Sequence, residues 1–122
     1  MKPRVIVVDD TIAMAETLAD GLADHGFEAT AIGSGRAAVE AARADRVDVV
    51  VTDLRMPDVD GIAVIEMLRS SGLDVPVIVM TAYGAIDSAV ESIRKGAYRY
   101  LTKPFKLDEL VTLVRRAVDD RG

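Results

Sequence analysis

The stretch that decides the fold is VIVVDD, residues 5–10, in which four consecutive apolar residues end on two aspartates. Three similar runs follow it and also end on polar residues: VVVTD at 49–53, VIVMT at 77–81 and YLTK at 100–103. Short, continuous apolar runs are typical of parallel strands that are covered on both faces. We therefore predict a parallel sheet whose carboxyl edge carries Asp9, Asp10, Asp53, Thr81 and Lys103.

Segments with helical periodicity separate these runs. We predict strands at 4–8, 27–32, 47–52, 75–80 and 98–102, and helices at 11–25, 36–44, 62–70, 85–95 and 107–119. In the first helix, Ile12 is expected on the buried face, and Gly26 is expected to end the helix in the left-handed conformation. In the fourth helix, we expect the apolar stripe of Ile86, Ala89, Val90 and Ile93 to face the core. Five β-α units in series predict an α/β fold with a doubly wound, five-stranded parallel sheet.

Composition limits the function classes. The 122 residues fit one domain, 1–122, and the absence of cysteine excludes disulfides and thiolate metal sites. The formal net charge of -5 argues against direct nucleic-acid binding. No apolar run approaches the roughly 20 residues of a membrane span, and the N-terminus lacks the apolar stretch of a signal peptide. We expect a cytoplasmic protein with no membrane contact.

The polar residues at the strand ends suit phosphoryl chemistry. Ligands of parallel α/β sheets bind beyond the carboxyl ends of the strands. Carboxylates that are close together repel one another unless a cation lies among them, and Mg²⁺ prefers oxygen ligands. Asp53 is the expected nucleophile because it follows the most apolar and most central run, and a carboxylate can attack phosphorus. The ammonium of Lys103 and the hydroxyl of Thr81 would stabilise charge on the transferred group.

In these residues the chain resembles the receiver domain of two-component response regulators. The matching motifs are Asp9-Asp10, Asp53 with Met56-Pro57 and Asp60-Gly61, Thr81-Ala82, and Lys103-Pro104-Phe105. The resemblance covers the whole chain and implies a flavodoxin-like three-layer sandwich with strand order 2-1-3-4-5. It also implies that Asp53 receives a phosphoryl group from a sensor histidine kinase or a phosphotransfer protein. The domain would catalyse its own phosphoryl transfer and a slow autodephosphorylation, without being an enzyme.

The resemblance assigns the metal ligands. Asp10 and Asp53 would bind Mg²⁺ directly, together with the main-chain carbonyl of Arg55. Asp9 would act largely through water. Lys103 would pair with the phosphate.

The resemblance further implies a switch. The bond between Lys103 and Pro104 would be cis, Thr81 would move toward the phosphoryl group, and Tyr100 would turn inward. The surface of the fourth helix, fifth strand and fifth helix would then rearrange, to control an attached or partner transcription output. Apart from the resemblance, charged residues could form a homodimer face on this surface: Asp87, Glu91, Arg94, Lys95, Arg99, Arg115, Arg116 and Asp119.

Two further stretches, 53–61 and 95–100, look most like the nitrogen-regulator class of response regulators. In the receiver family, the positions two residues after the acceptor and two after the threonine tune the lifetime of the acyl phosphate. Here they are Arg55 and Tyr83, and both are large enough to hinder an attacking water. We therefore expect a phosphorylated state that lasts minutes or longer.

Two alternatives remain open from the sequence. Gly33, Gly35 and Ala38 satisfy the pattern G-x-G-x-x-A between a strand and a helix, with Asp53 following, which is the fingerprint of a dinucleotide-binding domain. A tight turn before the second helix also explains these glycines. The other alternative is a receiver-like module that binds a protein partner without using phosphate.

Overall fold

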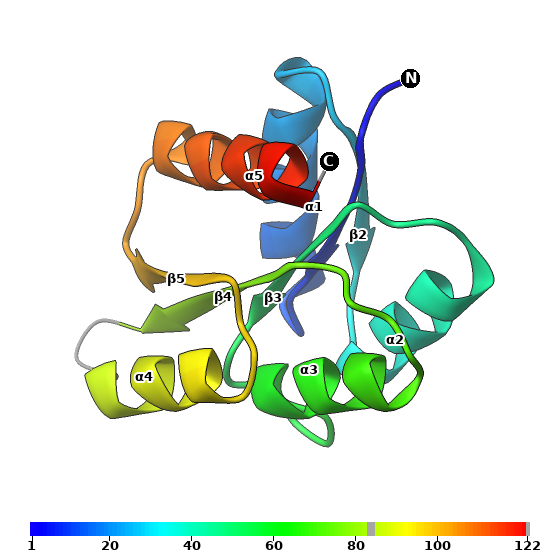
Figure 1. Cartoon of the computed structure of the whole chain (residues 1–122). Helices are drawn as coiled ribbons and strands as arrows, with labels where there is room; N and C mark the ends of the chain where they lie inside the picture. The colour runs from blue at the N-terminus through cyan, green and yellow to red at the C-terminus, as the bar shows by residue number, and fades with distance from the viewer. Residues whose placement is uncertain (83–84, 122) are drawn as a thin grey trace.

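The computed structural model describes residues 1–82 and 85–121, in which five strands alternate with five helices (Figure 1). The first half of this part contains β1 (Arg4–Val8), α1 (Ile12–Asp24), β2 (Glu28–Ile32), α2 (Gly35–Ala44) and β3 (Val49–Asp53). The second half contains α3 (Gly61–Ser70), β4 (Val77–Ala82), α4 (Ile86–Arg94), β5 (Arg99–Lys103) and α5 (Leu107–Arg121). All ten predicted elements are present, and their ends differ from the predictions by one or two residues at most positions.

The five strands form one parallel sheet in the order β2-β1-β3-β4-β5, as expected. In the register, Val5 of β1 pairs with Val49 of β3, and Val51 of β3 pairs with Ile78 of β4. The order reverses between β1 and β3, so the crevice at the carboxyl edge of these two strands is the expected ligand position.

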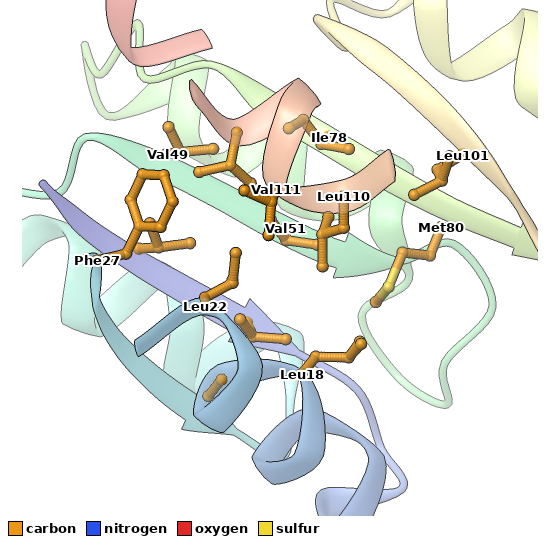
Figure 2. Packing of buried hydrophobic residues seen from close by; sticks show 14 of the residues in the cluster. Leu18, Leu22, Phe27, Val49, Val51, Ile78, Met80, Leu101, Leu110 and Val111 are labelled. Atoms are coloured by element: carbon orange, nitrogen blue, oxygen red, sulfur yellow. The ribbon is translucent and has the colours of Figure 1, made fainter. Parts of the chain in front are cut away.

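Helices cover both faces of the sheet, with α1 and α5 on one side and α2, α3 and α4 on the other (Figure 1). Alternate strand residues point to opposite faces. Val5 and Val7 therefore pack under α1 and α5, whereas Ile6 and Val8 pack under α2 and α3. Figure 2 shows the first of these cores, where Leu22 of α1 and residues of α5 meet the valines of the central strands.

Local signals set the helix ends. The side chains of Ser34 and Asp60 accept hydrogen bonds from main-chain N–H groups in the first turns of α2 and α3, at 3.2 and 2.8 Å. Gly26 follows α1 with φ +93°, which confirms the predicted left-handed cap. At α5 the carboxylate of Glu109 accepts the Lys106 N–H at 3.1 Å, so this helix is capped without Asp or Asn before it.

Two predictions of burial were wrong. In α4, Ile86, Val90 and Ile93 are 51%, 48% and 40% exposed, and only Ala89 of the apolar stripe is buried. The helix turns its small side chains, Ala89 and Ser92, toward the sheet, so its large apolar side chains point outward. Ile12, at the first position of α1, is also exposed, whereas the rest of the predicted face is buried: Ala15, Leu18, Ala19 and Leu22.

Among the described residues, no helix is long and apolar enough to cross a membrane.

Candidate functional site

The predicted site residues converge at the carboxyl edge of the sheet. Asp9 and Asp10 follow β1, Asp53 is the last residue of β3, and Lys103 is the last residue of β5. Oxygen atoms of the three carboxylates lie within 4.8 Å of one another. Parallel strands that end at the same edge bring together residues that are far apart in the sequence. The polar residues at the ends of the apolar runs therefore predicted this cluster.

Lys103 links the two most buried carboxylates of the cluster. Its Nζ lies 3.4 Å from Oδ2 of Asp9 and 3.4 Å from Oδ1 of Asp53. Asp9 is only 2% exposed, so its charge needs such a partner, and its Oδ1 also accepts the Thr11 N–H at 2.9 Å. The peptide bond between Lys103 and Pro104 is cis, as the family resemblance implied.

The site disfavours a negative charge on Asp53. Burial raises the pKa of the Asp53 carboxyl above its ordinary value of 3.8, and the nearby Asp9 raises it further. Lys103 and the Leu54 N–H, which donates to Oδ1 at 3.1 Å, lower the pKa but do not cancel the effect of burial. A bound cation would favour the ionised form, so the cluster is suited to a positively charged ligand.

Thr81 carries a buried hydroxyl without a partner. The residue is 1% exposed in β4, and within residues 1–82 and 85–121 its Oγ1 is the one buried side-chain polar atom that has no hydrogen-bond partner. A buried unpaired hydroxyl costs free energy, and such groups in native proteins call for a functional explanation. The hydroxyl lies on the strand beside β3, whose last residue is Asp53.

The remaining predicted residues are placed as follows. Arg55 is exposed in the loop after β3, and its Nη2 donates to Oγ of Ser88 in α4 at 3.3 Å. Ser88 was not among the predicted site residues, and no local pattern indicates a contact between residues 33 positions apart. Tyr100 is on the surface and is 37% exposed. Tyr83 lies outside the described residues.

The dinucleotide alternative gains no support from the geometry. Gly33 and Gly35 follow β2, which is an edge strand, whereas the reversal of strand order lies between β1 and β3. A dinucleotide fingerprint is expected at that reversal, where the ligand crevice lies. Gly35 instead contacts the loop between β3 and α3.

Comparison with known proteins identifies the family. Residues 5–115 match the family described as the response regulator receiver domain. The regulatory protein AtoC of Escherichia coli is 42% identical over 115 residues, which cover 94% of this chain and 25% of AtoC. The DNA-binding transcriptional regulator NtrC of the same species is 40% identical over 93% of this chain and 24% of NtrC. The chain thus spans about a quarter of the length of these two relatives.

A solved structure with the same architecture is the beryllofluoride-activated NtrC4 receiver domain dimer. It is 33% identical, its TM-score is 0.89, and the match covers 98% of each chain. The family match spans most of the chain, and transcriptional regulators of the NtrC class are among the relatives. The chain therefore belongs to the response regulator receiver domains of two-component signalling.

Proposed function

We propose that Asp53 is the phosphoacceptor of this receiver domain and that its phosphorylation depends on Mg²⁺. The observation that carries the proposal is the arrangement around Asp53, where two further carboxylates and the Lys103 ammonium gather at the reversal of strand order. A nucleophile, a set of oxygen ligands and a cation that can pair with phosphate are the parts that phosphoryl transfer requires.

The donor set fits Mg²⁺. Asp10 and Asp53 would bind the ion directly, and Asp9 would hold one of its waters. The main-chain carbonyl of Arg55 would be a further ligand of the ion. It is available for this role because, in the described part of the chain, it accepts no hydrogen bond. Three carboxylates against one ammonium leave an excess of negative charge, which a divalent cation offsets. When bound, the ion would neutralise charge on the phosphoryl oxygens.

The transfer would start from a phosphohistidine of a sensor kinase or phosphotransfer protein. A carboxylate oxygen of Asp53 attacks the phosphorus, so an O–P bond forms while the N–P bond breaks. The histidine nitrogen keeps the electron pair of that bond and takes a proton from water. Lys103, which in this structure pairs with Asp53, then pairs with a phosphoryl oxygen. The chain itself provides these groups, which supports self-catalysed transfer and slow autodephosphorylation.

Thr81 and Tyr100 would convert the phosphorylation into a change of surface. The unpaired Thr81 hydroxyl would donate to a phosphoryl oxygen, which gives it the partner that it lacks in this structure. Tyr100 would then turn inward from its exposed position, and the surface of α4, β5 and α5 would rearrange. This surface already exposes three large apolar side chains of α4. We propose that it controls a transcription output and forms a homodimer; the NtrC4 receiver of the comparison is described as a dimer in its activated form.

Arg55 and Tyr83 would set the lifetime of the acyl phosphate by hindering an attacking water. Replacing both with small residues should shorten the lifetime from minutes or longer. Decay of the phosphorylated protein, followed by intact mass, measures this, and equal decay rates in variant and wild type would reject the role.

The experiment that tests the proposed function is intact mass spectrometry after incubation with acetyl phosphate, with and without Mg²⁺. The wild-type protein should gain one phosphoryl group only with Mg²⁺, and Asp53→Asn should gain none. If the folded wild-type protein gains nothing, the alternative of a binding module that does not use phosphate becomes the better description.

A further inference from the structure

The start of α2 presses against the loop between β3 and α3. A Cβ atom on Gly35, the first residue of α2, would lie 2.7 Å from the main-chain oxygen of Val59 and 2.8 Å from Cγ2 of Val64. Backbone atoms cannot move aside as a flexible side chain can, so the contact requires glycine. The side chain of Val59 is buried in the core between α2, α3 and the sheet, and this burial holds the loop in place.

An ion pair reinforces this contact between the adjacent residues, Arg36 of α2 and Asp58 of the loop. Nη2 of Arg36 lies 3.2 Å from Oδ2 of Asp58, and Nε lies 3.4 Å from the same oxygen. Asp58 has φ +67°, a conformation that aspartate tolerates better than most residues. Together, Gly35 and Arg36 hold two consecutive loop residues, Asp58 and Val59, against the first turn of α2.

The loop between β3 and α3, residues 54–60, has few main-chain hydrogen bonds; we call it the acceptor loop. The Leu54 N–H donates to the carbonyl of Met80 at 2.8 Å, and the Gly61 N–H donates to the carbonyl of Leu54 at 2.9 Å. For the residues that the structure describes, no backbone hydrogen bond holds Arg55 or Met56. The position of the Arg55 carbonyl therefore depends on Leu54 at one side and on the α2 contact at the other. The side chains of Arg55, which donates to Ser88, and of Met56, which packs against the core, support it in between.

We propose that Gly35 and Arg36 are positioning residues for the phosphoacceptor site. They hold Asp58 and Val59 against α2 and thereby keep the Arg55 carbonyl where a Mg²⁺ ion shared with Asp10 and Asp53 requires it. The inference rests on the proposed function, in which this carbonyl is a Mg²⁺ ligand. It also gives the glycine pattern of residues 33–38 a role, since the second glycine permits a contact between backbones rather than an approach to a nucleotide.

The test compares Mg²⁺ affinities by titration calorimetry in matched variants. Gly35→Ala is paired with Gly33→Ala, because a Cβ on Gly33 would make only an ordinary 3.7 Å contact with Ile12. Arg36→Gln is paired with Arg36→Lys, which keeps the charge, and with Arg43→Gln, which removes an exposed arginine of α2 that pairs with Glu40 at 3.6 Å.

We expect Gly35→Ala to weaken Mg²⁺ binding about tenfold, as is typical when a group that supports a ligand is lost. Arg36→Gln should weaken it about two- to fivefold, the range of an exposed ion pair, and Arg36→Lys should restore most of the affinity. The two controls should bind Mg²⁺ as the wild type does. Amide hydrogen exchange in the acceptor loop should be faster in Gly35→Ala and Arg36→Gln than in the controls, without Mg²⁺.

Wild-type Mg²⁺ affinity in both Gly35→Ala and Arg36→Gln would overturn the inference. If Gly35→Ala does not fold, the comparison of Arg36→Gln with Arg36→Lys and Arg43→Gln decides, and equal affinities in all three would overturn it. Either result would leave the proposed function intact, since that function requires only that the wild-type protein bind Mg²⁺ and accept a phosphoryl group. A wild-type protein that binds no Mg²⁺ would overturn the inference and the proposed function together.

Discussion

Asp53→Asn is expected to stabilise the protein in the absence of metal, although it removes the proposed acceptor. The Asp53 carboxylate lies within 4.8 Å of the carboxylates of Asp9 and Asp10, and burial raises its pKa above the ordinary 3.8. A raised pKa means that the folded protein disfavours the charged form. Asparagine keeps the size and the acceptor oxygen for the Leu54 N–H, while it removes the charge.

The distances give the size of the effect. At an effective dielectric constant of about 20, unit charges 4.8 Å apart repel by about 3 kcal/mol, and Asp53 meets two such neighbours. On the same scale, the Lys103 ammonium at 3.4 Å attracts Asp53 by about 5 kcal/mol. The two repulsions together exceed this attraction by about 2 kcal/mol, and burial acts in the same direction. We expect Asp53→Asn to raise the free energy of unfolding by about 1 kcal/mol, a usual gain for a stabilising substitution.

Thermal unfolding followed by circular dichroism measures this effect. For a domain of this size, about 1 kcal/mol corresponds to a Tm increase of roughly 4 °C in EDTA. Mg²⁺ should raise the Tm of the wild type by mass action and should raise that of Asp53→Asn less, because a ligand is missing. Asp20→Asn, which changes an exposed aspartate of α1, should leave both Tm values unchanged.

Two results would refute this reasoning. A lower Tm of Asp53→Asn in EDTA would show that the attraction by Lys103 outweighs burial and repulsion. An undiminished increase of its Tm with Mg²⁺ would show that Asp53 is not a ligand of the ion.

Four other predictions follow from single contacts. First, the gap in free energy of unfolding between Asp53→Asn and the wild type should depend on pH. Folding raises the pKa of the Asp53 carboxyl, so this carboxyl adds stability below its ordinary value of 3.8. It loses this contribution as the pH rises through the raised pKa. Urea unfolding without metal should therefore show a gap that widens as the pH rises above the ordinary value of 3.8, and a constant gap would contradict this prediction. Second, Thr81→Val should raise the free energy of unfolding by about 1 kcal/mol, because it removes a buried unpaired hydroxyl; a loss of stability would mean that the hydroxyl has a partner. Third, Arg69→Met should lower the free energy of unfolding by about 2 kcal/mol, because the guanidinium donates to three main-chain carbonyls at 2.9, 3.0 and 3.2 Å. Chemical denaturation measures this change, and an unchanged midpoint would refute the prediction. Fourth, Val90→Ser, on the exposed face of α4, should change stability by no more than about 0.5 kcal/mol, and a loss typical of a core residue would restore the interpretation that this stripe is buried.

The sequence predicted the sheet well because its strands are covered on both faces. The runs that became β1, β3 and β4 are continuously apolar, and such runs leave few alternatives to a central parallel strand. The order of the strands came from the family resemblance rather than from these runs. The face of α4 was predicted wrongly because periodicity shows which residues share a stripe, but not whether that stripe or its neighbour meets the sheet. In α4 the face that meets the sheet contains Ala89, the smallest member of the stripe, and Ser92, and both side chains are small enough to pack closely.

The sequence predicted which residues meet at the site, but not the free energies of their interactions. The ends of the parallel strands indicated that Asp9, Asp53 and Lys103 meet, and their ion pairs follow from that topology. The direction of the Asp53 pKa required the burial of its side chain, which no motif encodes. The contact of Arg36 with Asp58 joins exposed residues 22 positions apart, and sequence spacing gives no signal for such a pair.

The features that destabilise this structure are also the ones that a phosphoryl group would correct. Thr81 lacks an acceptor, and phosphoryl oxygens are acceptors. Lys103 is shared between two carboxylates, and a phosphoryl group would offer it a stronger partner. A ligand shifts a conformational equilibrium only by the difference in its interactions with the two states, and these two residues supply such a difference. The adjacent helix α4 buries only Ala89 and Ser92 and, among the residues that the structure describes, has no side-chain cap at its start, unlike α3, which Asp60 caps. We therefore expect a small difference at the site to be enough to move α4, because little apolar surface holds this helix in place.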